Sequence, residues 1–559
     1  VADMFLPMLM SQIIDKGVKV GGQAGMQAVL HYGAIMVAVA IGALVCGILA
    51  GRFASIASTG FAANLRQAMF ANIQSFSFSN IDRFSTAGLV TRLTTDVTNV
   101  QNAFQMLMRM AIRSPVMLIF SMIVSFRISH DISMTFLIIL PILSVALFFI
   151  IRSVFPVFTR VFRTYDELNN VVQENVRGIR VVKSFNQEQH EIRKFGAISE
   201  RIYKDFSKGE RLITLNAPLM QSCIYACMII ISWLGAKAII ASGNDPALGL
   251  TTGNLTALIT YAMQILSSLM MLSMVFAMLT ISLSSARRIA EVIEEKTDIQ
   301  NPEQPVMAVR DGAIDFDHVS FVYASKADKK VLDDIDLHIR SGETIGVIGG
   351  TGASKSSLVQ LIPRLYDVTA GKLTLGGVDV RDYDLETLRN AVAMVLQKNE
   401  LFSGTIKENL RWGNENATDE ELQHACVLAC ADEFISAMPD GYDTYIEQGG
   451  TNVSGGQKQR LCIARALLKK PKVLILDDST SAVDTRTDAQ IQQALSAYIP
   501  ETTKIIIAQR ISSVQNADRI VVLDDGHIAD VGSHEELLHT SEIYREVYES
   551  QQKGGEDDA

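Results

Sequence analysis

Two short stretches of this sequence carry residues suited to holding phosphate groups and a metal ion. The first, GGTGASKSS at residues 349–357, follows an apolar stretch and precedes a helical apolar period. Backbone N–H groups in a glycine-rich loop and at the start of a helix bind phosphate oxygens, a lysine reaches the outer phosphates, and a hydroxyl holds magnesium. Lys355 and Ser356 match the last two roles. The other predicted nucleotide-binding residues of this loop are Gly349, Gly350, Thr351, Gly352 and Ser357.

The second stretch, VLILDD at residues 473–478, reads as a buried strand that ends in two carboxylates. Such a strand places a carboxylate beside a magnesium–nucleotide site, and Asp477 is the predicted ligand together with Ser356. One carboxylate is enough to hold the metal. The second, Asp478, is therefore a candidate for orienting the water that attacks the nucleotide.

The glycine-rich loop departs from its template at one position. The pattern G-x-x-x-x-G-K-[ST] asks for glycine at 354, where this sequence has serine. Either the loop closes without a positive φ at Ser354, or Ser354 is strained there.

Between these stretches, NVSGGQKQRLCIARALLKKPK at residues 452–472 resembles the signature motif of ATP-binding cassette proteins. The resemblance implies that Ser454, Gly455, Gly456 and Gln457 act on the nucleotide site of a partner chain. Three further residues match positions whose roles are known in the family. Tyr323 matches the aromatic residue that stacks on adenine, and Gln397 matches the glutamine that joins magnesium to the membrane-facing surface. Asp484 matches a residue of the loop that crosses the dimer interface. The cofactors implied are ATP and Mg²⁺.

Two residues depart from the family pattern in the same direction. Asp478 stands where the family usually has a glutamate that polarises water, and its carboxylate falls roughly 1.5 Å short. Gln509, in IIIAQRIS, stands where a histidine usually contacts the γ-phosphate, and glutamine carries neither a proton nor a positive charge for the reaction. We expect a site that binds ATP and hydrolyses it poorly.

Residues 1–280 carry long apolar runs, which predict a membrane domain in front of this site. Six candidate spans are long enough for ~30 Å of hydrocarbon, and the first is clipped, so the sequence reads as starting partway through a membrane helix. A single such run could be a buried helix of a soluble protein, but six in series make that interpretation unlikely. Lys and Arg concentrate in the long connections, which predicts that these connections and both termini are cytoplasmic.

Two features of the spans remain open. Arg109 and Arg113, one helical turn apart, indicate either an anion-facing cavity or side chains that reach the interface. The methionines of the sixth span share one face and serve either cargo binding or helix packing; they are Met263, Met270, Met274 and Met278.

The predicted architecture is an all-α membrane domain of six helices with cytoplasmic extensions, followed by an α/β P-loop domain. Its predicted parts are a transmembrane domain at 1–296, a linker at 297–311, an ATP-binding cassette at 312–548 and a polar tail at 549–559. This order resembles the half-transporter exporters of the multidrug-resistance type. The stretches at 78–97 and 171–191 resemble the two intracellular loops of that family, and we expect the loops near 76–86 and 160–170 to couple the membrane domain to the cassettes.

The resemblance implies a subunit of an exporter in a bacterial plasma membrane. Its expected partner is a homologous half-transporter with an intact glutamate and histidine, and its cargo is an amphipathic drug, lipid or peptide. A homodimeric slow exporter and an ATP-gated channel or sensor are the alternatives. The net charge of −10 argues against nucleic acid as a partner.

Overall fold

The computed structural model describes residues 2–247, 249–323, 330–350, 352–478 and 483–556. Two compact units emerge from the contacts along the chain. The first contains residues 1–74 and 87–295, and the second contains residues 75–86 and 296–559. The short segment 75–86 therefore belongs by its contacts to the second unit, although it interrupts the first in sequence.

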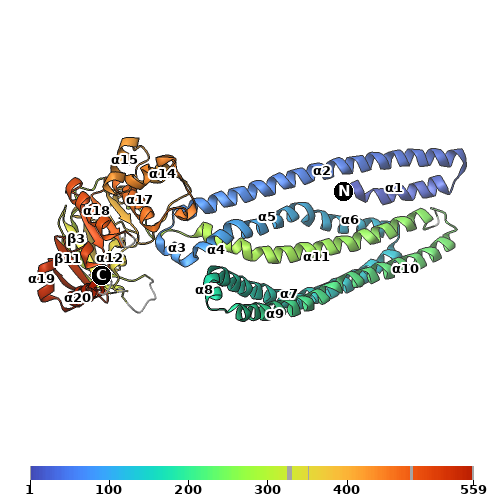
Figure 1. The fold of residues 1–559 in the computed structure, drawn as a ribbon. Helices are drawn as coiled ribbons and strands as arrows, with labels where there is room; N and C mark the ends of the chain where they lie inside the picture. The colour runs from blue at the N-terminus through green and yellow to red at the C-terminus, as the bar shows by residue number, and fades with distance from the viewer. Residues whose placement is uncertain (1, 248, 324–329, 351, 479–482, 557–559) are drawn as a thin grey trace. The chain divides into compact units, whose positions relative to one another are not determined.

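The first unit is built from helices (Figure 1). They are α1 (Leu6–Gln12), α2 (Gly22–Gln74), α4 (Thr86–Thr91), α5 (Val97–Met106), α6 (Arg113–Ile128), α7 (His130–Arg177), α8 (Ile179–Ser184), α9 (Glu188–Thr214), α10 (Asn216–Ser242) and α11 (Thr252–Glu294). Helices are the expected solution for apolar segments in a bilayer, because a helix pairs its backbone polar groups within itself.

Five helical stretches among the described residues are long and apolar enough to cross a membrane. They are Gly22–Gln74, Thr86–Ile128, His130–Arg177, Glu188–Ser242 and Thr252–Phe276. The predicted first span corresponds to α1 and the π-helical turn η2 (Ile13–Val18), which are shorter than a spanning helix needs. The chain is thus a multi-pass membrane protein. Its described residues contain five helices long enough to span a membrane, where the sequence predicted six.

The long helix that contains α4, α5 and α6 has an irregular backbone at two places. The π-helical turns η3 (Arg92–Asp96) and η4 (Leu107–Ala111) interrupt it. At η3, the buried Asp96 accepts a hydrogen bond from Ser285 Oγ (2.8 Å) and pairs with Arg288, both on α11. This pair holds the interrupted helix against the end of α11.

The two positions expected for the second intracellular loop differ in outcome. Residues 160–170 lie inside α7, which continues to Arg177, so this range was placed too early. The chain reverses at Gly178 and forms the short helix α8, and both lie within 171–191, the stretch that resembles the loop of the family.

The second unit contains two larger sheets and a two-stranded one. A six-stranded sheet has the order β12-β11-β3-β10-β9-β6, and a four-stranded antiparallel sheet has the order β2-β1-β4-β5. The strands are β1 (Ile314–Phe321), β2 (Leu332–Ile339), β3 (Thr344–Gly349), β4 (Ala370–Leu375), β5 (Val378–Asp379), β6 (Val392–Val395), β7 (Gly404–Thr405), β8 (Tyr445–Ile446), β9 (Val473–Asp477), β10 (Thr503–Ile507), β11 (Arg519–Asp524) and β12 (His527–Gly532).

Helices flank these sheets and make the second unit an α/β domain (Figure 1). They are α3 (Phe78–Phe84), α12 (Lys355–Leu361), α13 (Leu385–Ala391), α14 (Ile406–Arg411), α15 (Asp419–Leu428), α16 (Asp432–Ser436), α17 (Gly455–Leu468), α18 (Thr485–Tyr498), α19 (His534–Thr540) and α20 (Glu542–Glu556). Residues 549–556, predicted to be part of a polar tail, are the last two turns of α20.

The large sheet places the chemistry at one edge. Strands β3, β10, β9 and β6 run parallel, so their carboxyl ends share that edge. Both β9 and β10 are buried along their whole length, as near-continuous apolar strands of a parallel sheet should be. The loops that leave these four strands carry Gly350, Gln509, Asp478 and Gln397.

Candidate functional site

A cavity of about 510 Å³ lies at the carboxyl edge of the parallel sheet. It is lined by Gly349, Gly350, Gly352, Ala353, Ser354, Lys355, Ser356, Ser357, Gln397, Asp477, Asp478, Ile507 and Gln509. Most of the predicted phosphate and metal ligands therefore come together here. Thr351, also predicted, lies outside the described residues.

The glycine-rich loop joins β3 to α12 with serine in a left-handed conformation. Ser354 has φ 66° and ψ 21°, a region that costs a residue with a Cβ about 1–2 kcal/mol. Of the two alternatives raised above, the structure thus shows the strained serine. The first three residues of α12, Lys355 to Ser357, line the cavity.

The side chain of Lys355 donates hydrogen bonds to the backbone of its own glycine-rich loop. Its Nζ donates to the carbonyl oxygens of Gly349 (2.8 Å) and Gly350 (2.9 Å). Burial lowers the pKa of Lys355, while the charges of Asp478 and Asp477 oppose that shift. An arriving phosphate gives this ammonium a better partner than two neutral carbonyls, because a charge-assisted hydrogen bond is roughly twice as strong.

Ser356 and Asp477 have the chemistry of a magnesium site. Ser356 Oγ donates to Asp477 Oδ1 over 3.1 Å, and Asp477 is only 3% exposed. Burial raises the pKa of Asp477, and the neighbouring Asp478 adds to the shift, so a divalent cation at this point would restore the charged form. A hydroxyl, a carboxylate and nucleotide phosphates are the oxygen ligands that Mg²⁺ prefers. Gln397, the third predicted ligand, lines the same cavity, and its amide donates to Asp478.

Two glutamine amides donate hydrogen bonds to the carboxylate of Asp478. Gln509 Nε2 donates to Asp478 Oδ2 over 2.7 Å, and Gln397 Nε2 donates to the same oxygen over 3.2 Å. The backbone of Asp478 is left-handed (φ 47°), and the residue is 8% exposed. The two family departures, Asp478 and Gln509, are thus direct partners.

Sequence reasoning missed two residues that support this arrangement. Gln551 on α20 donates from Nε2 to the carbonyl of Gln509 (2.7 Å) and accepts from the N–H of Ile511 (2.9 Å). Gln459 on α17 donates to the carbonyl of Asp478 over 3.3 Å. Gln459 sits inside the quoted signature segment, but Gln551 lies about 40 residues from its partners in a polar stretch without any motif.

Tyr323, the predicted adenine platform, stands beside the same loop. Its hydroxyl is 2.7 Å from Ser357 Oγ, and 43% of the residue is exposed. The ring of Tyr366 lies edge-on to it, with centroids 5.1 Å apart. Tyr366 in turn donates from its hydroxyl to Asp82 Oδ2 on α3 over 2.9 Å. This second tyrosine links the predicted adenine platform to the helix of segment 75–86.

The signature residues do not line the cavity at the P-loop. Ser454 caps the N-terminus of α17 with a capping box, in which its Oγ accepts from Gln457 N–H and Gln457 Oε1 accepts from Ser454 N–H. Ser454 and Gly455 are exposed, and Gly456 and Gln457 are partly exposed. A 14-residue helix that offers an exposed N-terminus is suited to an anion from outside the chain.

Asp484, the predicted interface residue, is also exposed and outside the cavity. It caps α18 through a 2.9 Å hydrogen bond from Thr487 N–H, which lowers the pKa of its carboxyl. Ser479 to Ala482, which precede it, lie outside the described residues.

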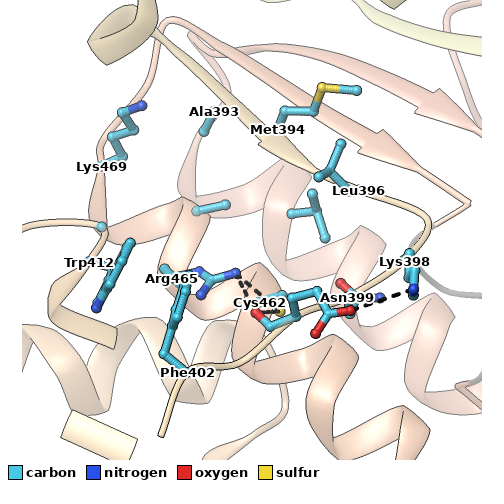
Figure 2. A pocket seen from close by; sticks show the side chains of 14 residues that line it. Ala393, Met394, Leu396, Lys398, Asn399, Phe402, Trp412, Cys462, Arg465 and Lys469 are labelled. Carbon is cyan, nitrogen blue, oxygen red and sulfur yellow. Dashed lines mark hydrogen bonds and ion pairs between the residues drawn. The ribbon is translucent and has the colours of Figure 1, made fainter. Parts of the chain in front are cut away.

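A second cavity, of about 340 Å³, opens beside the segment that follows Gln397 (Figure 2). Phe402 and Trp412 stack at its rim with centroids 4.1 Å apart, and Arg465 donates to the carbonyl of Glu400 (3.2 Å). None of the predicted nucleotide ligands lines it. This cavity is therefore distinct from the nucleotide site.

Comparison with known proteins agrees with this geometry. Residues 1–270 match the model of the ABC transporter transmembrane region, and residues 332–481 match that of the ABC transporter family. An uncharacterized ABC transporter ATP-binding protein of Bacillus subtilis (strain 168), YfiB, is 36% identical over 98% of this chain and 94% of its own length. A probable multidrug resistance ABC transporter ATP-binding/permease protein of the same organism, YheI, is 34% identical over 76% of this chain and 72% of its own.

Among solved structures, the chain is similar to a bacterial Atm1-family ABC exporter with ATP bound. The TM-score is 0.83 over 98% of this chain and 96% of the other, at 24% sequence identity. The fold is that of an ABC exporter.

Proposed function

The chain belongs to the ABC transporter family, whose members couple ATP hydrolysis to transport across a membrane, and on that premise we propose that it is one subunit of a heterodimeric exporter. Its own P-loop site binds ATP and hydrolyses it poorly. Its signature residues, Ser454 to Gln457, complete the competent site of a partner subunit. The cargo is an amphipathic drug, lipid or peptide that leaves the cytoplasm.

This proposal rests on one observation: the side-chain amides of Gln509 and Gln397 both donate hydrogen bonds to Asp478 Oδ2. A carboxylate that orients water must offer the water an oxygen close to the γ-phosphate. Asp478 is one methylene shorter than glutamate, and Gln509 and Gln397 both donate to one of its two oxygens. A displacement of about 1 Å at a reacting group can cost ~100-fold in rate, so this site is expected to turn over slowly.

Binding of ATP does not require the features that are altered. The P-loop, Lys355, Ser356 and Asp477 keep their expected chemistry, and magnesium would be held by Ser356 and Asp477, with Gln397 nearby. Bound Mg²⁺ would neutralise phosphate charge. Asp484 and the signature residues lie on surfaces where a second cassette would meet this one. A partner with an intact glutamate and histidine would then supply the fast site.

We also propose that the protein lies in a bacterial plasma membrane. Six spans, the first including α1 and η2, would put the cassette and the segment 75–86 on the cytoplasmic side. The basic residues of the long connections support this orientation.

The proposal is tested by identifying the nucleotide retained on each subunit. The complex is purified from its native membrane, incubated with radiolabelled 8-azido-ATP under turnover conditions, and photo-crosslinked. Label on this chain should be mostly triphosphate, and label on the partner mostly diphosphate. A complex that contains only copies of this chain, or diphosphate on this chain formed as fast as overall turnover, would contradict the proposal.

A further inference from the structure

A buried carboxylate lies in the first turn of α18, outside the nucleotide cavity. Asp488 is 7% exposed, and its N–H donates to the carbonyl oxygen of Asp484, the N-cap residue of this helix, over 3.0 Å. Its side-chain Oδ2 accepts a hydrogen bond from Ser513 Oγ over 2.7 Å. Ser513 ends the short 3-10 turn η7 (Ile511–Ser513), which begins two residues after Gln509. The carboxylate therefore joins the start of α18 to the segment that follows Gln509.

Burial makes this carboxylate costly unless hydrogen bonds compensate it. Asp488 Oδ1 is buried and has no hydrogen-bond partner among the described residues. Within the described part of the chain, Ser513 is thus the one side chain that compensates the charge of Asp488. A hydrogen bond to an ionised group is roughly twice as strong as a neutral one. This bond therefore fixes the position of η7 relative to α18.

Gln509 lies in an exposed loop between two fixed points of the backbone. Gln509 and Arg510 are exposed, whereas Ala508 before them and Ile511 after them are buried. The end of β10 fixes the start of this loop, and η7 fixes its end. Gln551 bonds to the loop from α20, and the carboxylate on α18 holds η7 from a second helix. The place of η7 therefore decides where the loop lies.

The position of the loop decides which groups the amide of Gln509 can reach. Gln509 lines the nucleotide cavity, and its Nε2 donates to Asp478 Oδ2 over 2.7 Å. It occupies the place expected to face the γ-phosphate, and an amide N–H can donate to a phosphate oxygen. N–H···O hydrogen bonds span about 2.7–3.2 Å, so a loop shift of about 1 Å abolishes one. Any contact between Gln509 and a phosphate thus depends on how η7 is anchored.

We propose that Asp488, through Ser513, is a positioning residue for the Gln509 loop and thereby sets the affinity of this site for the γ-phosphate of ATP. The inference rests on the proposed binding of ATP at this chain's own P-loop, and it adds a residue that makes the site prefer a nucleoside triphosphate to a diphosphate. ADP has no γ-phosphate, so its binding does not depend on Gln509. Asp488 does not line the cavity and acts only through the loop.

Photolabelling on ice tests the proposal without hydrolysis. The purified complex is incubated with Mg²⁺ and radiolabelled 8-azido-ATP or 8-azido-ADP and irradiated, and the label on this chain is measured against nucleotide concentration. Ser513→Ala should raise the apparent Kd for 8-azido-ATP about tenfold, as expected for a lost hydrogen bond to a charged group, and change that for 8-azido-ADP by less than about twofold. Equal losses for both nucleotides, or unchanged binding of 8-azido-ATP, would overturn the proposal.

Three comparisons isolate the bond between Asp488 and Ser513. Ser513→Thr keeps the hydroxyl and should bind 8-azido-ATP within about threefold of the parent, and Ser512→Ala, at the exposed neighbouring serine, should change neither Kd by more than about twofold. Asp488→Asn leaves a neutral acceptor, so its Kd should lie between those of the parent and Ser513→Ala. The double variant should bind no more weakly than Ser513→Ala alone, because both changes remove one bond. Losses that add in full would refute the role of Asp488; melting curves verify that each variant is folded.

Gln509→Ala shows whether the bond acts through Gln509. This variant should raise the Kd for 8-azido-ATP by about as much as Ser513→Ala, and combining the two should add less than about twofold. Unchanged binding in Gln509→Ala, or full additivity with Ser513→Ala, would overturn the positioning role. The label is counted on this chain whatever its partner is, and no turnover takes place. A failure here therefore leaves the assignment of slow and fast ATP sites untouched, and a failure of that assignment leaves this test valid.

Discussion

Gln509 Nε2 lies 2.7 Å from Asp478 Oδ2, so the two residues that depart from the family pattern are bonded to each other. A histidine at 509 would carry a proton that could interact with phosphate, and a glutamate at 478 would extend one methylene farther into the cavity. In the structure, the neutral amide of Gln509 instead donates a hydrogen bond to the carboxylate of Asp478. The two departures thus behave as one structural unit.

Restoring both residues should therefore have a larger effect than restoring either one. We expect Asp478→Glu with Gln509→His to raise the hydrolysis rate at this chain's own site at least about tenfold, and each single change to do less, because coupled residues are not additive. The rate is measured in single turnover with the partner's site inactivated. Gln515→His, a nearby exposed glutamine, is the matched control. A double variant as slow as the parent would show that other residues limit this site.

Gln551 should stabilise the loop that carries Gln509. Its amide bonds to the carbonyl of Gln509 and the N–H of Ile511, so Gln551→Ala should speed amide hydrogen exchange at Ile511 and cost about 1 kcal/mol of local stability. Gln552→Ala is the control, because Gln552 donates to Tyr548 on the same helix and not, among the described residues, to the loop that carries Gln509. Exchange at Ile511 that is equal in both variants would remove Gln551 from the account.

Tyr366 should connect nucleotide binding with segment 75–86. The carboxylate of Asp82 accepts a hydrogen bond from the Tyr366 hydroxyl. Burial, followed by this hydrogen bond, raises the pKa of Tyr366, so the phenol stays protonated and remains a donor. Tyr366→Phe keeps the ring contact with Tyr323 and loses the bond to Asp82. We expect ATP affinity within about twofold of the parent and a lower amount of cargo transported per ATP.

The control for this prediction is Tyr383→Phe. Tyr383 also donates its hydroxyl in the second unit, but to the carbonyl of Leu375, away from α3. If Tyr366→Phe lowered transport and hydrolysis in strict proportion, its proposed coupling role would be refuted.

Sequence motifs could group residues of the P-loop cavity because each motif fixes a residue at or after the end of a strand. Asp477 is the last residue of β9, Lys355 and Gln397 follow β3 and β6, and parallel pairing brings those strand ends together. The left-handed φ of Ser354 was one of two alternatives, and only the backbone could choose between them. Gln551 could not be found, since its role depends on how α20 packs, which no local pattern encodes.

The membrane unit was predicted less closely. Hydropathy locates apolar runs and not the residues where a helix turns, so the loop expected near 160–170 lies inside α7, and only the motif at 171–191 includes the reversal at Gly178. The partner of Arg113 was also invisible, because Asp3 is 110 residues away. Of the methionines in the sixth span, Met263, Met270 and Met274 are exposed, which keeps both cargo contact and packing with another subunit possible for them.

Any test of the signature must account for the capping role of Ser454. Ser454→Ala removes the side-chain cap of α17, which by itself costs about 1 kcal/mol of stability. Ser533→Ala removes the same kind of capping box from α19, away from the signature. Comparing the two variants separates a loss of cap from a loss of catalysis.

The central claim is that this chain impairs its own site and serves its partner's, and ATP hydrolysis by the complete complex tests it most directly. Loss of a preorganised donor to developing charge typically costs about 2.7–4 kcal/mol, so Ser454→Ala should lower steady-state hydrolysis roughly 100- to 1000-fold. Asp478→Asn should lower it far less, and Ser533→Ala should leave it near the parent rate. Equal and severe losses in Ser454→Ala and Asp478→Asn would contradict the account and make Asp478 a working catalytic base.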